Sequence, residues 1–191
     1  MIPVSELHAG TVIRLEGEAY RVLEATPHAG TGKLSGFVHA RLMRLETGTQ
    51  TERRFHLGEK VEVQEVSKRS LEFSYQTGGE FYFMDPESFE QLPLPAHLIG
   101  DRHRFLKEGT RLPVEFLGEQ PVAVVFPETA DLKVVSTAQP MHATGTSTLK
   151  RAELENGMEV LVPLFIKEGE VVRVSTSTGK YVERVREGKQ H

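Results

Sequence analysis

Apolar and polar residues alternate in short runs along nearly the whole chain, and turn-forming residues separate the runs. Between residues 37 and 45, Val38, Ala40 and Leu42 fall on one face of an extended strand, while His39 and Arg41 fall on the other. Similar runs recur to the C-terminal end, and helix signals are scarce. The pattern predicts a mainly β fold with strands at residues 11–15, 19–25, 37–45, 49–55, 71–75, 80–84, 113–117, 121–125, 132–135, 160–162, 171–175 and 180–185.

Two of the gaps between these strands predict tight hairpins, at Glu16-Gly17-Glu18 and at Glu46-Thr47-Gly48. Gln76-Thr77-Gly78-Gly79 connects the strands at residues 71–75 and 80–84. One short helix is predicted after residue 84, with Asp85 as its N-cap and Pro86 at its first helical position.

The composition changes near Gln64 and near Phe126-Pro127, where apolar strands give way to polar or turn residues. These changes divide the chain into three domains of similar size, at residues 1–64, 65–127 and 128–191. Recurrent short strands in each third are typical of small β-barrels. Three small barrels in series are expected to bury little surface between them, which predicts a jointed, elongated monomer.

Composition limits the class of protein. Of 191 residues, 38% are hydrophobic and 26% are charged, no apolar run is long enough to span a membrane, and there is no cysteine. The first residues lack the features of a signal peptide, so a cytoplasmic location is expected. The net charge of −4 comes from residues 65–127, which hold 6 basic and 10 acidic residues. A general nucleic-acid coat is therefore excluded, and any such contact must be local, at the Lys33 loop, Arg53-Arg54, or Arg184, Arg186 and Lys189.

Lys33 is the most distinctive candidate residue, because it is the only charged residue in the run from His28 to Gly36. Three glycines make this run a loop, so the lysine lies near a hairpin tip and can reach a polyanion. The alternative is an ordinary solvated turn lysine. A phosphate-binding P-loop does not fit, because Pro27 and Leu34 stand where that motif needs Gly and Ser or Thr, and a strand follows instead of a helix.

Signals for an enzyme, a metal or a cofactor are weak. The eight histidines have no metal-ligand spacing, and no nucleophile elbow or dinucleotide-binding motif is present. Residues 101–104 form a polar cluster that is typical of a charged connection. Phe81-Tyr82-Phe83 could stack bases, but alternation predicts that Phe81 and Phe83 are buried in the core.

Several strings, in order and spacing, resemble bacterial elongation factor P over essentially the whole chain. They are Leu7-His8-Ala9-Gly10-Thr11, Leu45-Glu46-Thr47-Gly48, Glu52-Arg53-Arg54-Phe55, Phe83-Met84-Asp85-Pro86-Glu87-Ser88-Phe89-Glu90-Gln91, Asp131-Leu132-Lys133-Val134-Val135, Val162-Pro163-Leu164-Phe165, Gly169-Glu170-Val171 and Ser175-Thr176-Ser177-Thr178-Gly179-Lys180-Tyr181-Val182. The resemblance implies an SH3/KOW-like barrel followed by two OB-fold barrels, arranged as an L-shaped mimic of transfer RNA.

The resemblance also implies a function. Such a factor enters the 70S ribosome between the peptidyl and exit sites when synthesis stalls on consecutive prolines, and it positions the peptidyl-tRNA. The implied loop facing the peptidyl-tRNA consists of Gly30, Thr31, Gly32, Lys33, Leu34, Ser35 and Gly36, and the family often lengthens the tip residue with a modifying enzyme, here at Lys33. The candidate contacts to ribosomal RNA are Arg53, Arg54, Thr144, Gly145, Thr146, Tyr181 and Arg184.

Two positions depart from the family pattern. Leu34 stands where members with a tip lysine usually have glycine, and residues 139–147 replace a loop that usually contains Gly-Asp-Thr and contacts the exit-site codon. Three alternatives stay open: a divergent paralogue with another stalling-motif preference, a general OB-fold RNA-binding module, and, least supported by motifs, a hydrolase or nucleotidase.

Overall fold

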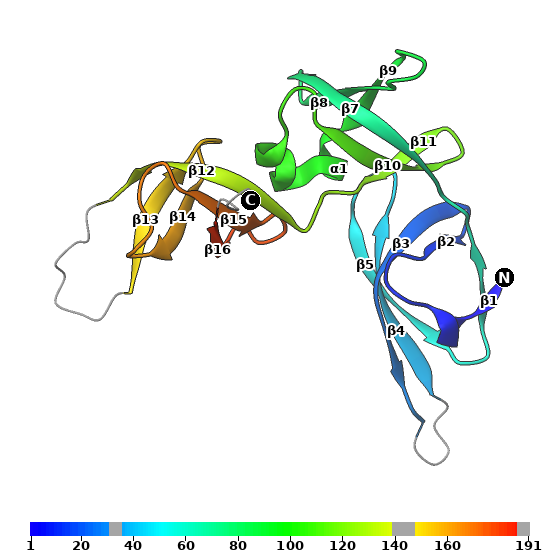
Figure 1. Ribbon diagram of the computed structural model, residues 1–191. Helices are drawn as coiled ribbons and strands as arrows, with labels where there is room; N and C mark the ends of the chain where they lie inside the picture. Colours follow the sequence, from blue (N-terminus) through cyan, green and yellow to red (C-terminus); the bar gives the residue numbers. More distant parts are fainter. Residues whose placement is uncertain (31–35, 139–147, 187–191) are drawn as a thin grey trace, which may run out of the picture. The chain divides into compact units, whose positions relative to one another are not determined.

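The computed structural model describes residues 1–30, 36–138 and 148–186. The described chain is mainly β, as predicted, and forms three antiparallel sheets that follow one another in the sequence (Figure 1). The chain divides into two compact units, residues 1–98 with 111–124, and residues 99–110 with 125–191.

The first sheet has the strand order β1-β6-β2-β3-β4-β5. Its core holds Val38, Ala40 and Leu42 from the predicted alternation, together with Phe55 and Ile13. Glu16 and Gly17 both have positive φ, 53° and 87°, as a two-residue hairpin turn of the primed type requires, and this turn confirms the first predicted hairpin. The elements are β1 (Ile2–Pro3), η1 (Val4–Glu6), β2 (Val12–Leu15), β3 (Glu18–His28), β4 (Phe37–Arg44), β5 (Gln50–His56) and β6 (Lys60–Val63).

The second sheet has the order β11-β10-β7-β8-β9. Phe81 and Phe83 are buried as predicted. The helix predicted at Asp85 is wrong: the Asp85 carboxylate accepts hydrogen bonds from the N–H groups of Glu87 and Ser88, but the chain turns back instead of continuing as a helix. The elements are β7 (Ser67–Thr77), β8 (Glu80–Met84), β9 (Gln91–Pro95), α1 (Ala96–Ile99), η2 (Gly100–Phe105), β10 (Arg111–Leu117) and β11 (Gln120–Val124).

The third sheet has the order β14-β13-β12-β15-β16 and belongs to the second unit. Phe105 packs against its core, and the Asn156 side chain donates a hydrogen bond to the carbonyl of Arg104 (3.0 Å). Residues 99–110 therefore belong to the same compact unit as the third sheet, although in the sequence they lie between strands of the second sheet. The strands are β12 (Thr129–Thr137), β13 (Leu149–Leu154), β14 (Glu159–Pro163), β15 (Val171–Ser175) and β16 (Tyr181–Val185).

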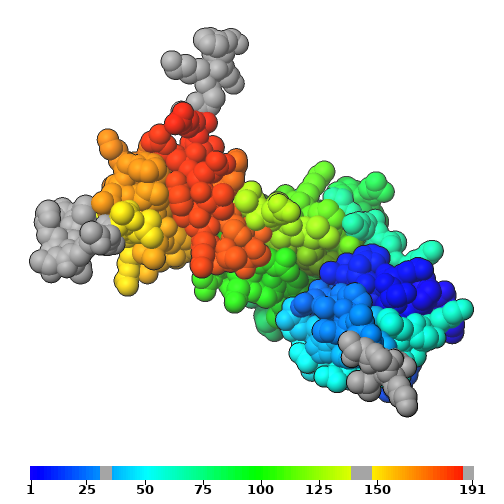
Figure 2. All heavy atoms as spheres, turned by 90° about the horizontal axis from the view of Figure 1, so that it is seen from below, coloured from blue at the N-terminus to red at the C-terminus, as the bar shows by residue number. Residues whose placement is uncertain are grey.

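The first two sheets pack against each other, contrary to the expectation of little contact between barrels. Val12, Leu45 and Val122 form a shared buried cluster, and the space-filling view shows this unit as a continuous body (Figure 2). Beside the cluster, Arg21 of β3 donates a hydrogen bond to the Glu115 carboxylate of β10 at 2.5 Å, and both side chains are largely buried. This junction fixes the first sheet on the second.

Candidate functional site

The predicted lysine loop connects β3 and β4, whose pairing runs from Tyr20–Arg44 to His28–Phe37. The connection follows the last pair, and β5 runs beside β4 to the same end, where His56 pairs with Phe37. Gly30 and Gly36 of the predicted loop are among the described residues. Thr31, Gly32, Lys33, Leu34 and Ser35 lie outside them.

Gly36 lies against the turn that follows β5. A Cβ at this position would lie 2.5 Å from Leu57 Cδ1, 2.8 Å from the His28 carbonyl oxygen and 3.0 Å from the Gly30 nitrogen. The Leu57 N–H also donates a hydrogen bond to the Gly36 carbonyl at 3.4 Å. Only glycine fits this approach without displacing backbone, so the base of the loop is tightly defined.

The outer face of β3, β4 and β5 carries a row of rings directly below the loop. Because side chains alternate across a strand and Val38 is buried, Phe37 points outward, and the register aligns it with His28 on β3 and His56 on β5. The rings of His28 and Phe37 stack at a centroid distance of 4.8 Å and an interplanar angle of 23°. The guanidinium of Arg54 lies over the Phe37 ring at 5.0 Å.

The next row of the same face pairs His39 with Arg54, and the row beyond it pairs Arg41 with Glu52. Here the basic side chains lie next to carboxylates, since His39 Nε2 lies 3.3 Å from a Glu52 oxygen and the Arg41 guanidinium lies 3.4 Å from a Glu24 oxygen. We call the surface nearest the loop, formed by His28, Phe37, His39, Arg54 and His56, the neck face. It presents rings and a guanidinium beside the loop and becomes acidic with distance from it.

The predicted pair Arg53-Arg54 is divided between the two faces of β5. Arg54 belongs to the neck face, whereas Arg53 lies on the side of the buried Phe55 ring, 5.9 Å from its centroid, and donates a hydrogen bond to Glu16 at 2.9 Å. Consecutive residues of a strand point to opposite faces, so Arg54 shares the face of His28 and Phe37 and Arg53 does not.

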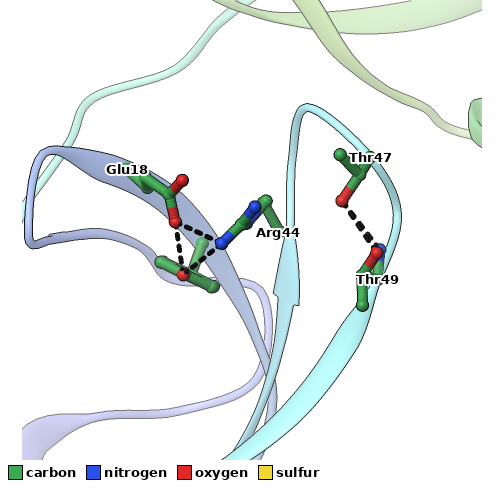
Figure 3. A network of polar contacts seen from close by, with 5 residues as sticks. Glu18, Arg44, Thr47 and Thr49 are labelled. Carbon is green, nitrogen blue, oxygen red and sulfur yellow. Dashed lines mark hydrogen bonds and ion pairs between the residues drawn. The ribbon is translucent and has the colours of Figure 1, made fainter.

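The end of the β3–β4 hairpin away from the loop is held by a polar network. Arg44 lies 2.6 Å from the Glu18 carboxylate and donates to the Tyr20 hydroxyl at 3.5 Å, and the next turn has a hydrogen bond from Thr47 to Thr49 at 2.9 Å (Figure 3). The bond to Tyr20 and the charge of Glu18 raise the pKa of Arg44, so it is cationic at all ordinary pH values. The hairpin is therefore anchored at its base and presents its far end.

The other predicted contacts lie on the third sheet. Tyr181 and Arg184 of β16 line an open groove of about 550 Å³ together with Arg173 and Phe165. Arg184 lies 5.5 Å from the Phe165 ring centroid and donates to Glu170 at 3.1 Å. The predicted residues Thr144, Gly145 and Thr146 lie outside the described residues.

The arginines of this groove are largely neutralised. Arg173 donates to both Asp131 oxygens, at 2.7 and 3.0 Å, and to Glu183 at 2.7 Å. These bonds raise the pKa of Arg173, and the same contact lowers the pKa of Asp131. The pKa of Glu170 is lowered first by the Lys167 N–H and then by Arg184. The groove therefore presents aromatic rings and already paired guanidinium groups to a ligand, and little net positive charge.

Rings and guanidinium groups next to a basic loop suit nucleic acid, because bases and riboses stack on such planes while cations meet phosphate. Among residues 1–30, 36–138 and 148–186, no group of three or more His, Cys, Asp or Glu side chains could hold a metal ion. Over the same ranges, no helix is long and apolar enough to cross a membrane.

Sequence reasoning found Arg54 but not its neighbours His28, Phe37 and His56. The sequence could have identified them, because the alternation places all three on the outward faces of their strands, and the register of the hairpin aligns them in one row. That register depends on a β-bulge between Val22 and Glu24, which alternation alone does not reveal.

Comparison with known proteins gives consistent matches in all three parts of the chain. The elongation factor P KOW-like domain matches residues 3–61, the elongation factor P OB domain matches residues 66–124, and the elongation factor P C-terminal domain matches residues 130–184. Elongation factor P of Carboxydothermus hydrogenoformans is 38% identical over 97% of this chain and 100% of its own length. Elongation factor P of Moorella thermoacetica is 38% identical over 96% of this chain and 100% of its own length.

A solved structure supports the fold. Translation initiation factor 5A from Methanococcus jannaschii superposes with a TM-score of 0.51 at 17% identity, over 65% of this chain and 92% of that one. At this identity the likeness concerns the fold alone. The three domain matches and the full-length relatives show that the chain belongs to the elongation factor P family, whose members are translation factors and not enzymes.

Proposed function

We propose that this protein binds the ribosome between the peptidyl and exit sites and promotes peptide bond formation at consecutive prolines. In this proposal the Lys33 loop orders the acceptor end of the peptidyl-tRNA, while the ribosome carries out the chemistry. The contribution is one of positioning, since an ordered nucleophile and ester react far faster than mobile ones. The protein acts as a cytoplasmic monomer with domains at residues 1–64, 65–127 and 128–191.

The observation that carries the proposal is the neck of the β3–β4 hairpin. Gly36 packs against Leu57 and the His28 carbonyl, so the loop starts from a fixed base. The stacked pair His28–Phe37 and the Arg54 guanidinium flank that base and can hold the RNA beside the loop. A rigid base with a reaching lysine is what a positioning factor needs.

The remaining predicted contacts take supporting roles in this proposal. Tyr181 and Arg184 offer a ring and a guanidinium group to ribosomal RNA. A modifying enzyme lengthens Lys33, with Leu34 beside it in place of the usual glycine. Intact-mass measurement of the protein from its native host, with fragmentation of the Lys33 peptide, tests the modification, and an unmodified mass would refute it.

The function is tested by translating a three-proline reporter in a reconstituted system with each variant added. Lys33→Ala is expected to lose rescue while keeping its fold, and Lys33→Arg to recover part of it, because a planar guanidinium poorly replaces a compact ammonium. Lys60→Ala, an exposed lysine on β6 of the same sheet, is the matched control and keeps full rescue. Full rescue by Lys33→Ala would refute the role of the loop.

The neck face is tested with the two neighbouring arginines. Arg54→Ala is expected to weaken binding to ribosomes that carry peptidyl-tRNA by about five- to tenfold, the usual cost of one charged contact to RNA. Arg53→Ala, which removes an equal charge from the other face of β5, is the control and changes binding by less than about twofold. Equal losses in the two variants would show that charge alone matters and not the face.

A further inference from the structure

A fully structured turn between β8 and β9 presents an exposed aromatic residue. Phe89 has 71% of its surface exposed and a φ of 58°, a left-handed backbone conformation that bulky residues rarely adopt. Glycine would take this conformation without strain. Exposure of the ring and the positive φ both lower the stability of the folded protein, which indicates that Phe89 serves in binding and not in folding.

The turn that holds Phe89 is fixed by its own hydrogen bonds. The Asp85 carboxylate accepts from the N–H groups of Glu87 and Ser88, and the Asp85 carbonyl accepts from the Phe89 N–H at 2.8 Å. The Asp85 N–H donates to the Glu90 carbonyl at 2.9 Å, which closes the turn. The turn therefore holds the Phe89 backbone in one conformation before binding, so binding costs little further conformational entropy of this segment.

The strands that flank this turn carry further aromatic and apolar residues on their outer face. Since Phe81 and Phe83 are buried, Tyr82 and Met84 of β8 point outward, and the register places Tyr82 between Tyr75 of β7 and Pro93 of β9. The rings of Tyr75 and Tyr82 stack at 4.8 Å with an interplanar angle of 13°. We call the surface of Tyr75, Tyr82, Met84, Phe89 and Pro93 the Phe89 face.

The turn that carries Phe89 is acidic. Residues 70–101 contain no Lys or Arg, and their carboxylates include Glu80, Glu87 and Glu90. The register places Arg111 of β10 in the row of Met84 on the outer face, where it is paired with Glu72 at 2.9 Å. Glu80 accepts a hydrogen bond from the Tyr82 hydroxyl at 3.1 Å, whereas no ion pair of Glu87 or Glu90 is found within the described ranges. An aromatic surface with an acidic rim repels phosphate, so it is unsuited to RNA despite its stacked rings.

The edge of the sheet also limits how a partner can bind. β9 is the last strand in the order of the second sheet, and Pro93 and Pro95 remove two N–H donors from it. Addition of a partner strand to this edge is therefore disfavoured. A partner must bind through side chains, which are the aromatic rings and carboxylates of the face.

We propose that the Phe89 face is a docking site for a Lys- and Arg-rich protein segment, with Phe89 as the apolar anchor and Glu87 and Glu90 as partners for its cations. Cationic side chains bind both carboxylates and ring faces, so the two features of the surface fit one class of partner. This inference rests on the proposed function, because the ribosome is where the protein meets such segments.

The test uses the full-length protein and purified ribosomes stalled on consecutive prolines. Phe89→Gly is expected to keep or raise the thermal midpoint, because glycine relieves the positive φ, and to weaken ribosome binding about tenfold, as loss of a central aromatic anchor does. Glu90→Lys weakens binding similarly. Glu119→Lys, at a 92% exposed side chain on the turn between β10 and β11 of the same sheet, is the control and leaves binding nearly unchanged.

A photo-reactive benzoyl-phenylalanine at position 89 identifies the partner. A cross-link to a Lys- or Arg-rich segment of a ribosomal protein, absent when the probe replaces Glu119, supports the proposal. A cross-link to RNA, to an uncharged protein segment, or no cross-link in a protein that binds normally overturns it while leaving the proposed function intact. Failure of the unaltered protein to bind ribosomes would overturn both.

Discussion

Replacing Gly36 with alanine should disturb the base of the lysine loop. The new Cβ would lie 2.5 Å from Leu57 Cδ1 and 2.8 Å from the His28 carbonyl oxygen. Leu57 is 43% exposed and can rotate away, but the His28 carbonyl belongs to the last residue of β3 and must move by several tenths of an ångström. The stacked His28–Phe37 pair would move with it.

The size of the effect follows from two opposing terms. Overpacking of this kind costs roughly 1–3 kcal/mol, whereas alanine in place of glycine restricts the unfolded chain and returns about 0.4–1 kcal/mol. The expected net loss in the free energy of unfolding is about 1–2 kcal/mol. The loss should be concentrated in the strand ends around residues 28 and 37.

Urea denaturation and hydrogen exchange of the β3–β4 amides measure this effect. Gly58→Ala is the matched control, because a Cβ there meets nothing within 4 Å, and it should be neutral or slightly stabilising. Combining Gly36→Ala with Leu57→Ala should restore only part of the loss, since the contact with the His28 carbonyl persists. If Gly36→Ala proves as stable as Gly58→Ala, the neck is not tightly packed and the rigid-base argument fails.

Two further outcomes are expected. Glu115→Gln breaks the nearly buried pair with Arg21 and should cost about 2–3 kcal/mol of unfolding free energy, whereas an exposed change such as Arg53→Ala should cost less than about 0.5 kcal/mol; equal costs in urea titrations would contradict this. Asp131 has a folded-state pKa below its unfolded value because of Arg173, so its stabilisation is present above the unfolded pKa and disappears as the pH falls through the folded pKa. Asp131→Asn should therefore flatten the acid limb of the stability curve of the second unit, and an unchanged limb would argue against this pair.

The sequence predicted the elements of local origin well. The alternation of Val38, Ala40 and Leu42 identified β4 and its buried face, and Glu16-Gly17 identified a hairpin turn. Strands β1, β6, β9 and β13 were missed, because they are short, carry prolines or carry several charges. These strands depend on pairing with neighbours more than on their own pattern.

What the sequence could not predict depends on contacts between distant residues. The prediction of a helix at Asp85 was wrong because the side chain of an aspartate before a proline makes the same hydrogen bonds at the start of a turn and at the start of a helix. Whether the chain continues as a helix depends on the residues that follow. The junction of Arg21 with Glu115 joins residues far apart in the chain, and no local pattern marks it. The neck face required a hairpin register that a bulge shifts by one residue.

The central claim is that this protein accelerates peptide bond formation with proline by positioning the peptidyl-tRNA. The most direct measurement is the rate of peptidyl transfer on ribosomes stalled at a three-proline codon run, with and without the unaltered protein, beside a matched message with phenylalanine codons. The account predicts a large acceleration on the proline message and little change on the other. Equal rates with and without the protein on the proline message would contradict it.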